Sequence, residues 1–366
     1  MILISPLNWG IGHAARIMTF IRIFQKYNVP FIVAADGKAY YFLKRYLTDN
    51  QIVIAPNLIV KYPKKGKYMP LKILIQMPKF ILFILKNKLW LKKIIKKYQV
   101  SVIISDNRFG FNHPLVYNIF ISHQLNIRVP EKYSFAKKLI DILNCYEIKK
   151  YDEVWVPDFS TRALSGELSL PVCKKIGIVR YINPLSRFMF YSSIEEIELQ
   201  CDILLIISGA EPQRTIFQQL LLEQMPTDKK IVLLSGKPDL SYVYRKKNIK
   251  IFSHIDDDVY MAALIKKAKI IIARAGYSTI MDLIALGKTA ILVPTPGQTE
   301  QEYLARYLQE KQLYISFEQE NFSFSEAIKI FNAKKNQLQK NILKLRNSLK
   351  ISNLENLILK NLLVKL

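Results

Sequence analysis

The chain has 366 residues, half of them hydrophobic, so it can bury two cores and is not an intrinsically disordered protein. Its formal net charge of +25 favours an anionic partner, although a composition rich in Lys, Ile and Asn also fits a bias without functional meaning. Three widely spaced cysteines, Cys145, Cys173 and Cys201, form no pair or metal motif and predict buried thiols in a reducing cytosol.

Short apolar segments alternate with helical stretches in the first half, which predicts a parallel sheet covered on both faces. Strands are expected at residues 2–5, 30–36, 51–55, 100–105, 118–122 and 153–157. Residues 181–193 contain a proline and little periodicity, so we interpret them as the connection between two domains.

A second series of the same kind follows this connection. Its strands are expected at 202–209, 229–236, 249–255, 269–276 and 288–297, with helices after each of the polar loops between them. We therefore predict an α/β protein with two Rossmann-like parallel domains facing across a cleft, at residues 1–185 and 186–345. Residues 346–366 are expected to form a helix that packs back toward the first domain. In such sheets ligands bind beyond the carboxyl ends of the strands.

Residues 61–97 contain many lysines and no acidic residue, with apolar side chains between them. This composition fits a surface that contacts an anionic membrane, with lysines on phosphates and apolar groups in the interface. Pro70 and Pro78 interrupt the stretch, and the alternative is a pair of ordinary core helices whose lysines face water. Nucleic acid is not an expected partner, because no binding motif accompanies the charge. No apolar run is long enough to span a bilayer and the opening MILIS resembles no signal peptide, so we expect a cytoplasmic protein, peripheral on the inner face of the cell membrane.

The opening loop NWGIGHAAR (8–16) contains Gly10, Gly12 and His13 in a G-x-G-x-x-A pattern. A dinucleotide fingerprint would turn directly off the first strand, whereas four residues, including the bulky Trp9, come first here. Asp36 at the end of the second strand would suit a ribose, but the geometry disfavours a nicotinamide cofactor. The glycines are better interpreted as presenting His13, whose position in the first turn of a helix favours the neutral imidazole of a general base.

All four histidines (His13, His113, His123 and His254) are expected in loops or at strand ends near the same sheet edges. Asp106, Asn107 and Arg108 follow a strand and would lie on this rim, where an acid beside an arginine is either a structural ion pair or a group that orients an acceptor hydroxyl. His123 and Gln124 follow the next strand in the same way.

Two glycine turns in the second half lead into helices, at Ser208-Gly209 and at Gly276. Exposed backbone N–H groups at such turns, with Arg214 and Arg274 nearby, predict an anion site suited to a pyrophosphate. Ser278 and Thr279 begin the second of these helices. Asp282 either closes a capping box with Thr279 or contacts a ribose diol.

The loop at 296–305 presents polar groups able to bind sugar hydroxyls, and Thr299-x-x-Glu302 is a possible cap; the polar residues are Gln298, Glu300, Gln301 and Glu302. The acids at 256–258 are expected at a helix N-terminus, which argues against a metal site.

The stretch ARAGYSTIMDLIALGKTAILVPTPGQTEQEYLARYL (273–308) resembles the donor-site signature of glycosyltransferase family 28, which has the GT-B fold. That family includes the N-acetylglucosaminyltransferase that completes the lipid-linked peptidoglycan precursor. His13 and the ISHQLN segment (121–126) resemble the first half of the family more loosely.

The resemblance implies a UDP-sugar as co-substrate, with Asp282 as the ribose acid, the two glycine turns on the diphosphate, Gln301 and Glu302 on the sugar, and His254 near the uracil or phosphate. It implies no metal or other cofactor, and an acceptor in the first domain attacked through His13 or Asp106 as base. The first loop has fewer glycines than the family pattern, and SDNRFG (105–110) is not part of that pattern, so the acceptor need not be the peptidoglycan lipid.

We therefore expect an inverting glycosyltransferase that moves N-acetylglucosamine or another hexose to a lipid-linked or glycan acceptor. The alternatives are a UDP-sugar epimerase of the same fold, and a non-catalytic nucleotide-sugar sensor or basic scaffold.

Overall fold

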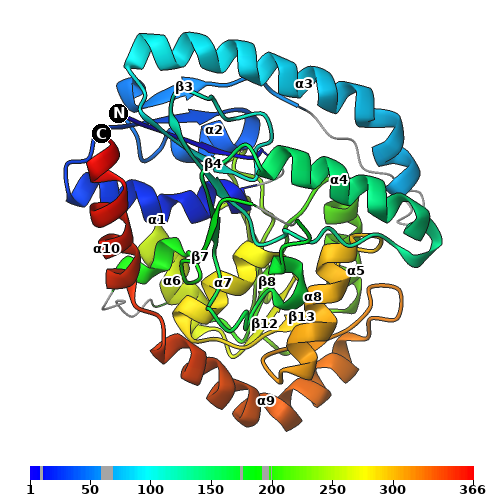
Figure 1. Ribbon diagram of the computed structural model, residues 1–366. Coiled ribbons are helices and arrows are strands. Elements are labelled where there is room, and N and C mark those ends of the chain that lie inside the picture. Colours follow the sequence, from blue (N-terminus) through cyan, green and yellow to red (C-terminus); the bar gives the residue numbers. More distant parts are fainter. Residues whose placement is uncertain (9–10, 59–68, 174–175, 192–197, 199) are drawn as a thin grey trace. The chain divides into compact units, whose positions relative to one another are not determined.

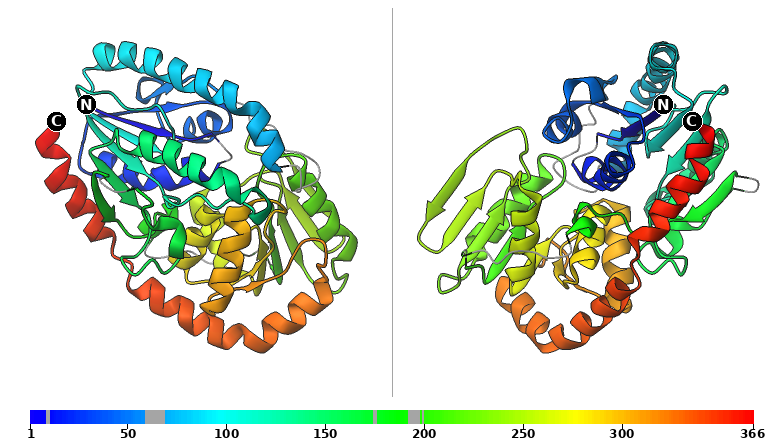
Figure 2. Two further views of the ribbon diagram at one scale, coloured as in Figure 1. Left: turned by 45° about the vertical axis from the view of Figure 1, so that its right-hand side comes forward. Right: turned by 90° about the vertical axis from the view of Figure 1, so that its left-hand side faces the viewer.

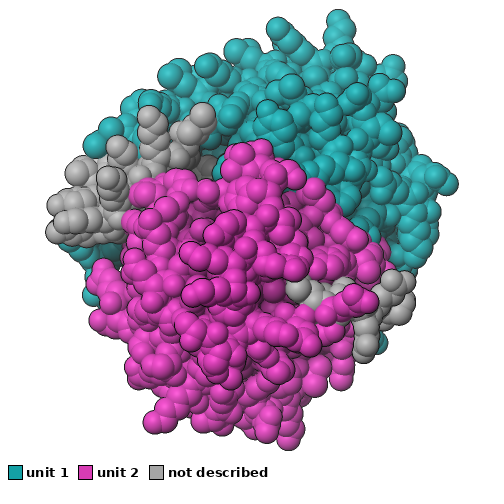
Figure 3. All heavy atoms as spheres, turned by 180° about the vertical axis from the view of Figure 1, so that it is seen from behind, with its two compact units in different colours: residues 1–60, 70–185, 350–366 teal, residues 61–69, 186–349 magenta. Residues whose placement is uncertain are grey.

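The computed structural model describes residues 1–8, 11–58, 69–173, 176–191, 198 and 200–366 (Figure 1). The chain forms two compact units (Figure 3). The first contains Met1–Val60, Pro70–Leu185 and Lys350–Leu366, and the second is built mainly from Ser186–Leu349. Each unit is organised around one seven-stranded sheet.

The first sheet is entirely parallel, in the order β3-β2-β1-β4-β5-β6-β7. Its strands are β1 (Ile2–Pro6), β2 (Phe31–Ala35), β3 (Ile52–Ile54), β4 (Val102–Asp106), β5 (Tyr117–Ile121), β6 (Glu153–Val156) and β7 (Ile178–Tyr181). β7 was not predicted, because it is a short edge strand whose residues are only partly covered and include Arg180. The central strands are buried on both faces, which explains their continuous apolar composition.

The helices of the first unit are α1 (Gly12–Lys26), α2 (Gly37–Leu43), α3 (Met69–Tyr98), α4 (Lys137–Ile148) and α10 (Ile351–Asn361). α1 covers one face of the sheet, where Phe20 stacks on Trp155 with ring centroids 5.9 Å apart. α3 covers the other face, because its Leu91 packs with Leu3 and Ile103. α4 lies on the face of α3, since its Ile148 packs with Phe120, which points the same way as Ile103 in the paired strands.

The described part of residues 61–97 forms one helix, α3, which continues through Pro78, rather than the pair of helices considered as the alternative. α10 belongs to the first unit, where Glu355 accepts a hydrogen bond from Lys26 of α1 at 2.8 Å (Figure 2).

The second sheet has the order β10-β11-β9-β8-β12-β13-β14. Its strands are β8 (Ile203–Ile206), β9 (Ile231–Leu234), β10 (Val243–Lys246), β11 (Ile249–Phe252), β12 (Ile270–Ala273), β13 (Ile291–Leu292) and β14 (Ile315–Ser316). The expectation of an all-parallel sheet is wrong at one edge, because β10 pairs antiparallel with β11. β10 is exposed along its length, so it lacks the apolar signature that identified the buried strands.

The second unit contains α5 (Gln213–Gln224), α6 (Asp258–Lys267), α7 (Tyr277–Leu286), α8 (Thr299–Glu310) and α9 (Phe324–Asn347). Short 3₁₀ turns in the chain are η1 (Asp49–Gln51), η3 (Glu131–Ala136), η4 (Gly166–Ser169), η5 (Arg187–Phe190) and η6 (Leu363–Lys365). Phe217 of α5 and Phe331 of α9 are fully buried in a core with the strands. α7 ends at Gly287, whose φ of 67° and tight contact with Arg346 both favour glycine.

Cys145 and Cys173 form a disulfide that joins α4 to the segment before β7. The prediction of three unpaired thiols is therefore wrong, because the fold brings together two residues 28 positions apart that no local motif connects. Cys201 is a buried free thiol, as expected. Among the residues that the structure describes, no helix is long and apolar enough to cross a bilayer.

Candidate functional site

The carboxyl edge of the first sheet carries a buried cluster of His13, Arg16 and Asp106. Pro6, the last residue of β1, pairs with Asp106, the last residue of β4, so the two strands end side by side at this edge. His13 Nδ1 lies 3.2 Å from Asp106 Oδ1. Arg16, one turn along α1, donates from Nε to Asp106 Oδ2 at 2.7 Å and from Nη2 to Oδ1. The loop and the helix thus bring three ionisable groups onto one strand end.

The charges of this cluster fix the protonation of its members. Burial alone would raise the pKa of Asp106, but Arg16 and His13 lower it to about 2, so it is an anion at neutral pH. Burial lowers the pKa of His13, against the opposing attraction of Asp106, so the imidazole is neutral. The His13 side chain is 16% exposed and that of Asp106 is 0% exposed, so only the histidine can reach a substrate.

His13 Nδ1 faces both Asp106 Oδ1 and Arg16 Nη2, which lies 3.0 Å away. The tautomer with its proton on Nδ1 donates to the carboxylate and leaves Nε2 as an acceptor. The other tautomer accepts at Nδ1 from Arg16, whose Nη2 carries two protons. Of the two residues that the sequence offered as a base, His13 is partly exposed and Asp106 is fully buried.

His123 and the loop after β4 complete this edge. His123 Nδ1 is 3.4 Å from Arg16 Nη1, which places His123 in the same cluster. Asn107 has a left-handed φ of 55°, and its Oδ1 accepts from Ser122 Oγ at 3.3 Å. The backbone of Gln124 donates to the same hydroxyl at 3.0 Å. Gly12 begins α1, and Gly10 lies outside the described residues.

Arg108 has a structural role rather than the predicted contact with an acceptor. Its guanidinium is fully buried and donates to Asp36 Oδ2 at 2.7 Å. It also reaches Asn87 of α3, 3.3 Å away, and the carbonyl of Pro56. Asp36, considered above as a ribose acid, is therefore held by Arg108 and by Asn8, which donates to it at 2.8 Å.

His113 does not join the other histidines of this unit. It precedes β5 and accepts from the backbone of Leu115 at 3.3 Å, while its own backbone N–H donates to Asn118. These contacts lie at the amino end of β5, whereas His13 and His123 lie at the carboxyl edge. The expectation that all four histidines share the same sheet edges is wrong for His113.

The second unit presents its candidate residues at the carboxyl edge of its own sheet. The loops after β8, β12 and β13 contain Ser208-Gly209, Gly276 and Gln298, and the loop after β11 contains His254. Gly209 has a φ of 100°, and no described atom lies within 4 Å of the position that a Cβ would take. Gly276 is the N-cap of α7, with Ser278 and Thr279 in the first turn. The first N–H groups of a helix have no partner within the helix, so turns of this kind suit an anion.

The two arginines near these turns are committed to the protein itself. Arg274 is fully buried and donates to the carbonyls of Val293, Pro294 and Gln213 at 3.1 to 3.2 Å, and burial lowers its pKa to about 9. Arg214 donates to Glu211 and to the carbonyls of Ser235 and Gly236. Both guanidinium groups therefore hold the loops at this edge of the sheet.

Asp282, on the second turn of α7, accepts a hydrogen bond from Ser186 Oγ at 2.6 Å. Burial raises its pKa to about 6, although Arg187 and the Ser186 hydroxyl oppose the shift. The capping-box interpretation is wrong, because the N-cap is Gly276 and Asp282 bonds to Ser186 rather than to the helix end. Arg187 is ion-paired with Asp258 of α6 at 2.9 Å, which fixes Ser186 beside α7.

Polar side chains at the start of α8 shape the loop before it. Gln301 Oε1 accepts from the backbone of Thr295 at 2.9 Å, and Glu302 Oε1 accepts from the backbone of Gly297 at 2.7 Å. Gln301 also donates to Gln298 at 2.5 Å. His254 is half-buried, with Nε2 3.8 Å from Asp256. Asp257, beside it, caps α6 through Val259 and Tyr260, as expected for acids at a helix start.

Comparisons with known proteins bear on the second unit and on the fold. Residues 203–357 match the glycosyltransferase family 28 C-terminal domain. The chain therefore resembles family 28 over these residues, most of which lie in its second unit, and its fold is GT-B. An uncharacterized glycosyltransferase of Methanosarcina acetivorans is 26% identical over 239 residues, which cover 60% of this chain and 61% of that protein.

A second relative comes from Rickettsia massiliae, a UDP-N-acetylglucosamine--N-acetylmuramyl-(pentapeptide) pyrophosphoryl-undecaprenol N-acetylglucosamine transferase. It is 30% identical over 218 residues, covering 56% of this chain and 53% of the relative. The chain thus matches between half and two thirds of the length of these two relatives. Among solved structures, the glycotransferase of kitacinnamycin shares the fold with a TM-score of 0.65 and 13% identity, over 98% of both chains.

Two residues of the candidate sites, one in each unit, were not predicted from sequence. Arg16 lies three positions after His13 on α1, a spacing that places both on one helix face and could have identified it. Ser186 lies in the segment interpreted as a connection, where nothing in the local pattern indicates a partner on α7.

Proposed function

We propose that the protein is an inverting hexosyltransferase that uses a UDP-sugar, with N-acetylglucosamine as the expected sugar. The contact between His13 and Asp106 carries the proposal, because it supplies a neutral, accessible base held by a buried anion. His13 Nε2 takes the proton of the acceptor hydroxyl while the hydroxyl oxygen attacks the anomeric carbon. The bond from that carbon to the diphosphate breaks, and UDP leaves with the electron pair.

The second unit is the proposed donor site. Asp282, with Ser186 bound to one of its oxygens, is suited to accept a hydrogen bond from a ribose hydroxyl. The turns at Ser208-Gly209 and Gly276-Ser278 would place backbone N–H groups on the diphosphate, where the α7 dipole stabilises the leaving charge. Gln298, Gln301 and Glu302 would contact the sugar, and His254 the uracil or phosphate edge. Because helix N-termini supply this stabilisation, we propose that no metal is required.

The acceptor is proposed to be lipid-linked or a membrane-proximal glycan, held near Gly12, Asn107, His123 and Gln124. α3 supports this, because its exposed side includes Ile81, Leu82, Leu85 and Leu89 together with lysines. An exposed surface of this kind suits the headgroup region of an anionic bilayer. The protein would then act on the inner face of the cell membrane. Replacing Lys86, Lys92 and Lys96 by glutamine should weaken flotation with phosphatidylglycerol vesicles, and unchanged partitioning would refute the α3 surface.

Thermal-shift measurements with UDP-, GDP-, TDP- and CDP-sugars test the donor site. We expect UDP-N-acetylglucosamine to raise the melting temperature of the wild type and not that of Asp282→Ala. Asp228→Ala is the matched control, because Asp228 is an exposed acid of the same unit paired with Lys229. If no nucleotide-sugar shifts the wild type, the proposed function is wrong. If a UDP-sugar alone exchanges a sugar proton with solvent, the protein is an epimerase.

A further inference from the structure

Helix α4 turns large apolar side chains toward water. Phe135, just before the helix, and Leu139, Ile142, Leu143 and Tyr146 within it are between 43% and 80% exposed. The helical members are three or four positions apart, so they form one continuous stripe. We call these five residues the α4 stripe.

Few side chains of α4 are buried against the rest of the unit. Within the helix only Asn144 and Ile148 are buried, and Asn144 donates to the carbonyl of Leu125 at 2.9 Å. The disulfide from Cys145 to Cys173 is the covalent attachment of the helix. Helices in proteins are normally stabilised by packing their apolar stripe against the core. In α4 the apolar stripe faces water instead of the core, and the disulfide attaches the helix to the rest of the unit.

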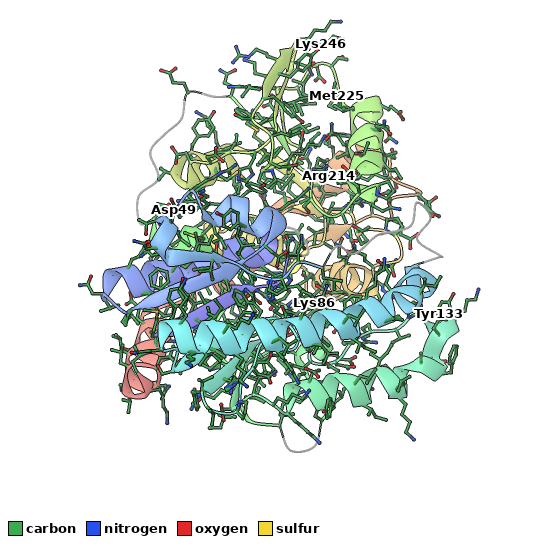
Figure 4. The ribbon with its side chains drawn as sticks, turned by 90° about the horizontal axis from the view of Figure 1, so that it is seen from above. Asp49, Lys86, Tyr133, Arg214, Met225 and Lys246 are labelled. Atoms are coloured by element: carbon green, nitrogen blue, oxygen red, sulfur yellow. A yellow bond between two sulfur atoms is a disulfide. The ribbon has the colours of Figure 1, made fainter. Side chains whose placement is uncertain are left out.

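The α4 stripe lies on the side of the first unit that carries α3. Both helices cover the same face of the first sheet, α3 over β1 and β4 and α4 over β5 and β6. Figures 1 and 4 show α4 running alongside α3, with Lys86 labelled on α3 and Tyr133 labelled just ahead of α4. The exposed leucines of α3 and the α4 stripe are thus parts of one side of the unit.

The charges on the side of the first unit formed by α3 and α4 favour a negatively charged binding partner. α3 contains eight lysines and no acidic residue. The acids of α4 are balanced, since Asp141 pairs with Lys137 and Glu147 pairs with Lys150. A second copy of the chain seated on this side would bring two sets of α3 lysines together, which is unfavourable. An anionic bilayer provides both apolar depth and negative charge.

We propose that α4 is a second membrane-binding helix, which inserts the α4 stripe into the interface of an anionic bilayer beside α3. This inference rests on the membrane surface proposed for α3 and extends it to a helix whose local sequence carries no strong basic charge. The two helices contribute different forces, since the lysines of α3 supply the attraction to phosphates and the α4 stripe supplies apolar insertion.

Vesicle flotation with the full chain tests the contribution of α4. The double variant Leu139→Gln/Ile142→Gln is compared with Val243→Gln/Tyr244→Gln, whose side chains are similarly exposed on β10 of the second unit. On vesicles containing phosphatidylglycerol, we expect the α4 variant to lose about tenfold in partitioning and the β10 variant to bind like the wild type. Both variants should keep the wild-type melting temperature, because the replaced side chains are exposed.

The outcomes separate the proposals. If the wild type binds vesicles and the α4 variant binds equally well, α4 is not a membrane helix, while the α3 surface stands. If the wild type does not float with anionic vesicles, both membrane proposals fail, but the donor site remains testable by thermal shift. If the wild type is a dimer by size-exclusion chromatography and the α4 variant is a monomer with unchanged flotation, the stripe is an interface between copies and the inference is overturned.

Discussion

His13 Nδ1 lies 3.2 Å from Asp106 Oδ1, and the two residues come from the first turn of α1 and the carboxyl end of β4. The carboxylate is fully buried and compensated by Arg16, so it stays ionised without contact with water. Its negative charge would stabilise the imidazolium that forms when His13 accepts a proton. His13 is thus a candidate proton acceptor, and Asp106 is the fixed negative charge beside it.

Replacing His13 by alanine should reduce turnover about 100-fold to 10,000-fold, the usual contribution of a positioned base. His113→Ala is the matched control, because His113 lies at the amino end of β5, and it should retain wild-type turnover. The rate should be constant near neutral pH and fall only in acid, at a pKa below the usual 6.5, because burial disfavours protonated His13. Equal turnover of His13→Ala and the wild type would contradict the assignment.

Asp106→Asn should reduce both turnover and stability. Turnover should fall roughly 100-fold or more, because His13 loses the anion that orients it. Stability should fall by about 3 to 5 kcal/mol, because Arg16 remains buried without its countercharge. Asp36→Asn provides the comparison, since it also unpairs a buried arginine, Arg108, but does not contact His13. If the two variants lose stability alike and turnover alike, Asp106 has only a structural role.

The sequence was sufficient for the parts of the fold that depend on local pattern. Buried parallel strands have continuous apolar runs, so the α/β class could be predicted. Glycine turns precede helices, so the positions of His13 and Gly276 at the starts of helices could be predicted as well. The edge strands β7 and β10 lack that pattern, because β7 is only partly buried and β10 is exposed along its length.

Contacts between residues distant in sequence could not be predicted. Arg16 and Asp106 are 90 positions apart, and the sequence offered Arg108, two positions away, as the nearer partner. Arg108 lies two residues beyond the end of β4, where the regular direction of strand side chains no longer applies. Its guanidinium donates to Asp36 instead. The bond from Ser186 to Asp282 likewise depends on how η5 meets α7, which no periodicity reports.

Asp282→Asn should stabilise the free protein while weakening donor binding. The pKa of Asp282 is raised to about 6, so the folded state binds a proton more tightly than the unfolded chain between about pH 4 and 6. This acid therefore lowers stability progressively as the pH rises through that range, and at pH 7 the variant should gain on the order of 1 kcal/mol. Thermal melts at pH 5 and pH 7 measure the effect, which should be larger at pH 7.

The same variant should bind UDP less tightly, because an amide is a weaker acceptor for a ribose hydroxyl than a carboxylate. Titration calorimetry with UDP and 2′,3′-dideoxy-UDP separates the ribose contact from the rest: the variant should lose affinity for UDP and little for the dideoxy form. Equal losses for both nucleotides would show that Asp282 supports the fold of the site without contacting the ribose.

Removing the disulfide should destabilise the first unit selectively. The bond closes a loop with a sequence separation of 28, so Cys145→Ser should cost about 3 kcal/mol through the greater freedom of the unfolded chain. Dithiothreitol should have the same effect on the wild type and none on the variant. Cys201→Ser is the control for reduction, because burial raises the pKa of the Cys201 thiol to about 12 and keeps it unreactive. Denaturant melts and non-reducing alkylation measure these effects, and three alkylated cysteines in the unfolded, unreduced protein would contradict the disulfide.

Because α4 buries only Asn144 and Ile148, hydrogen exchange of its backbone should increase more than that of α1 when the disulfide is broken.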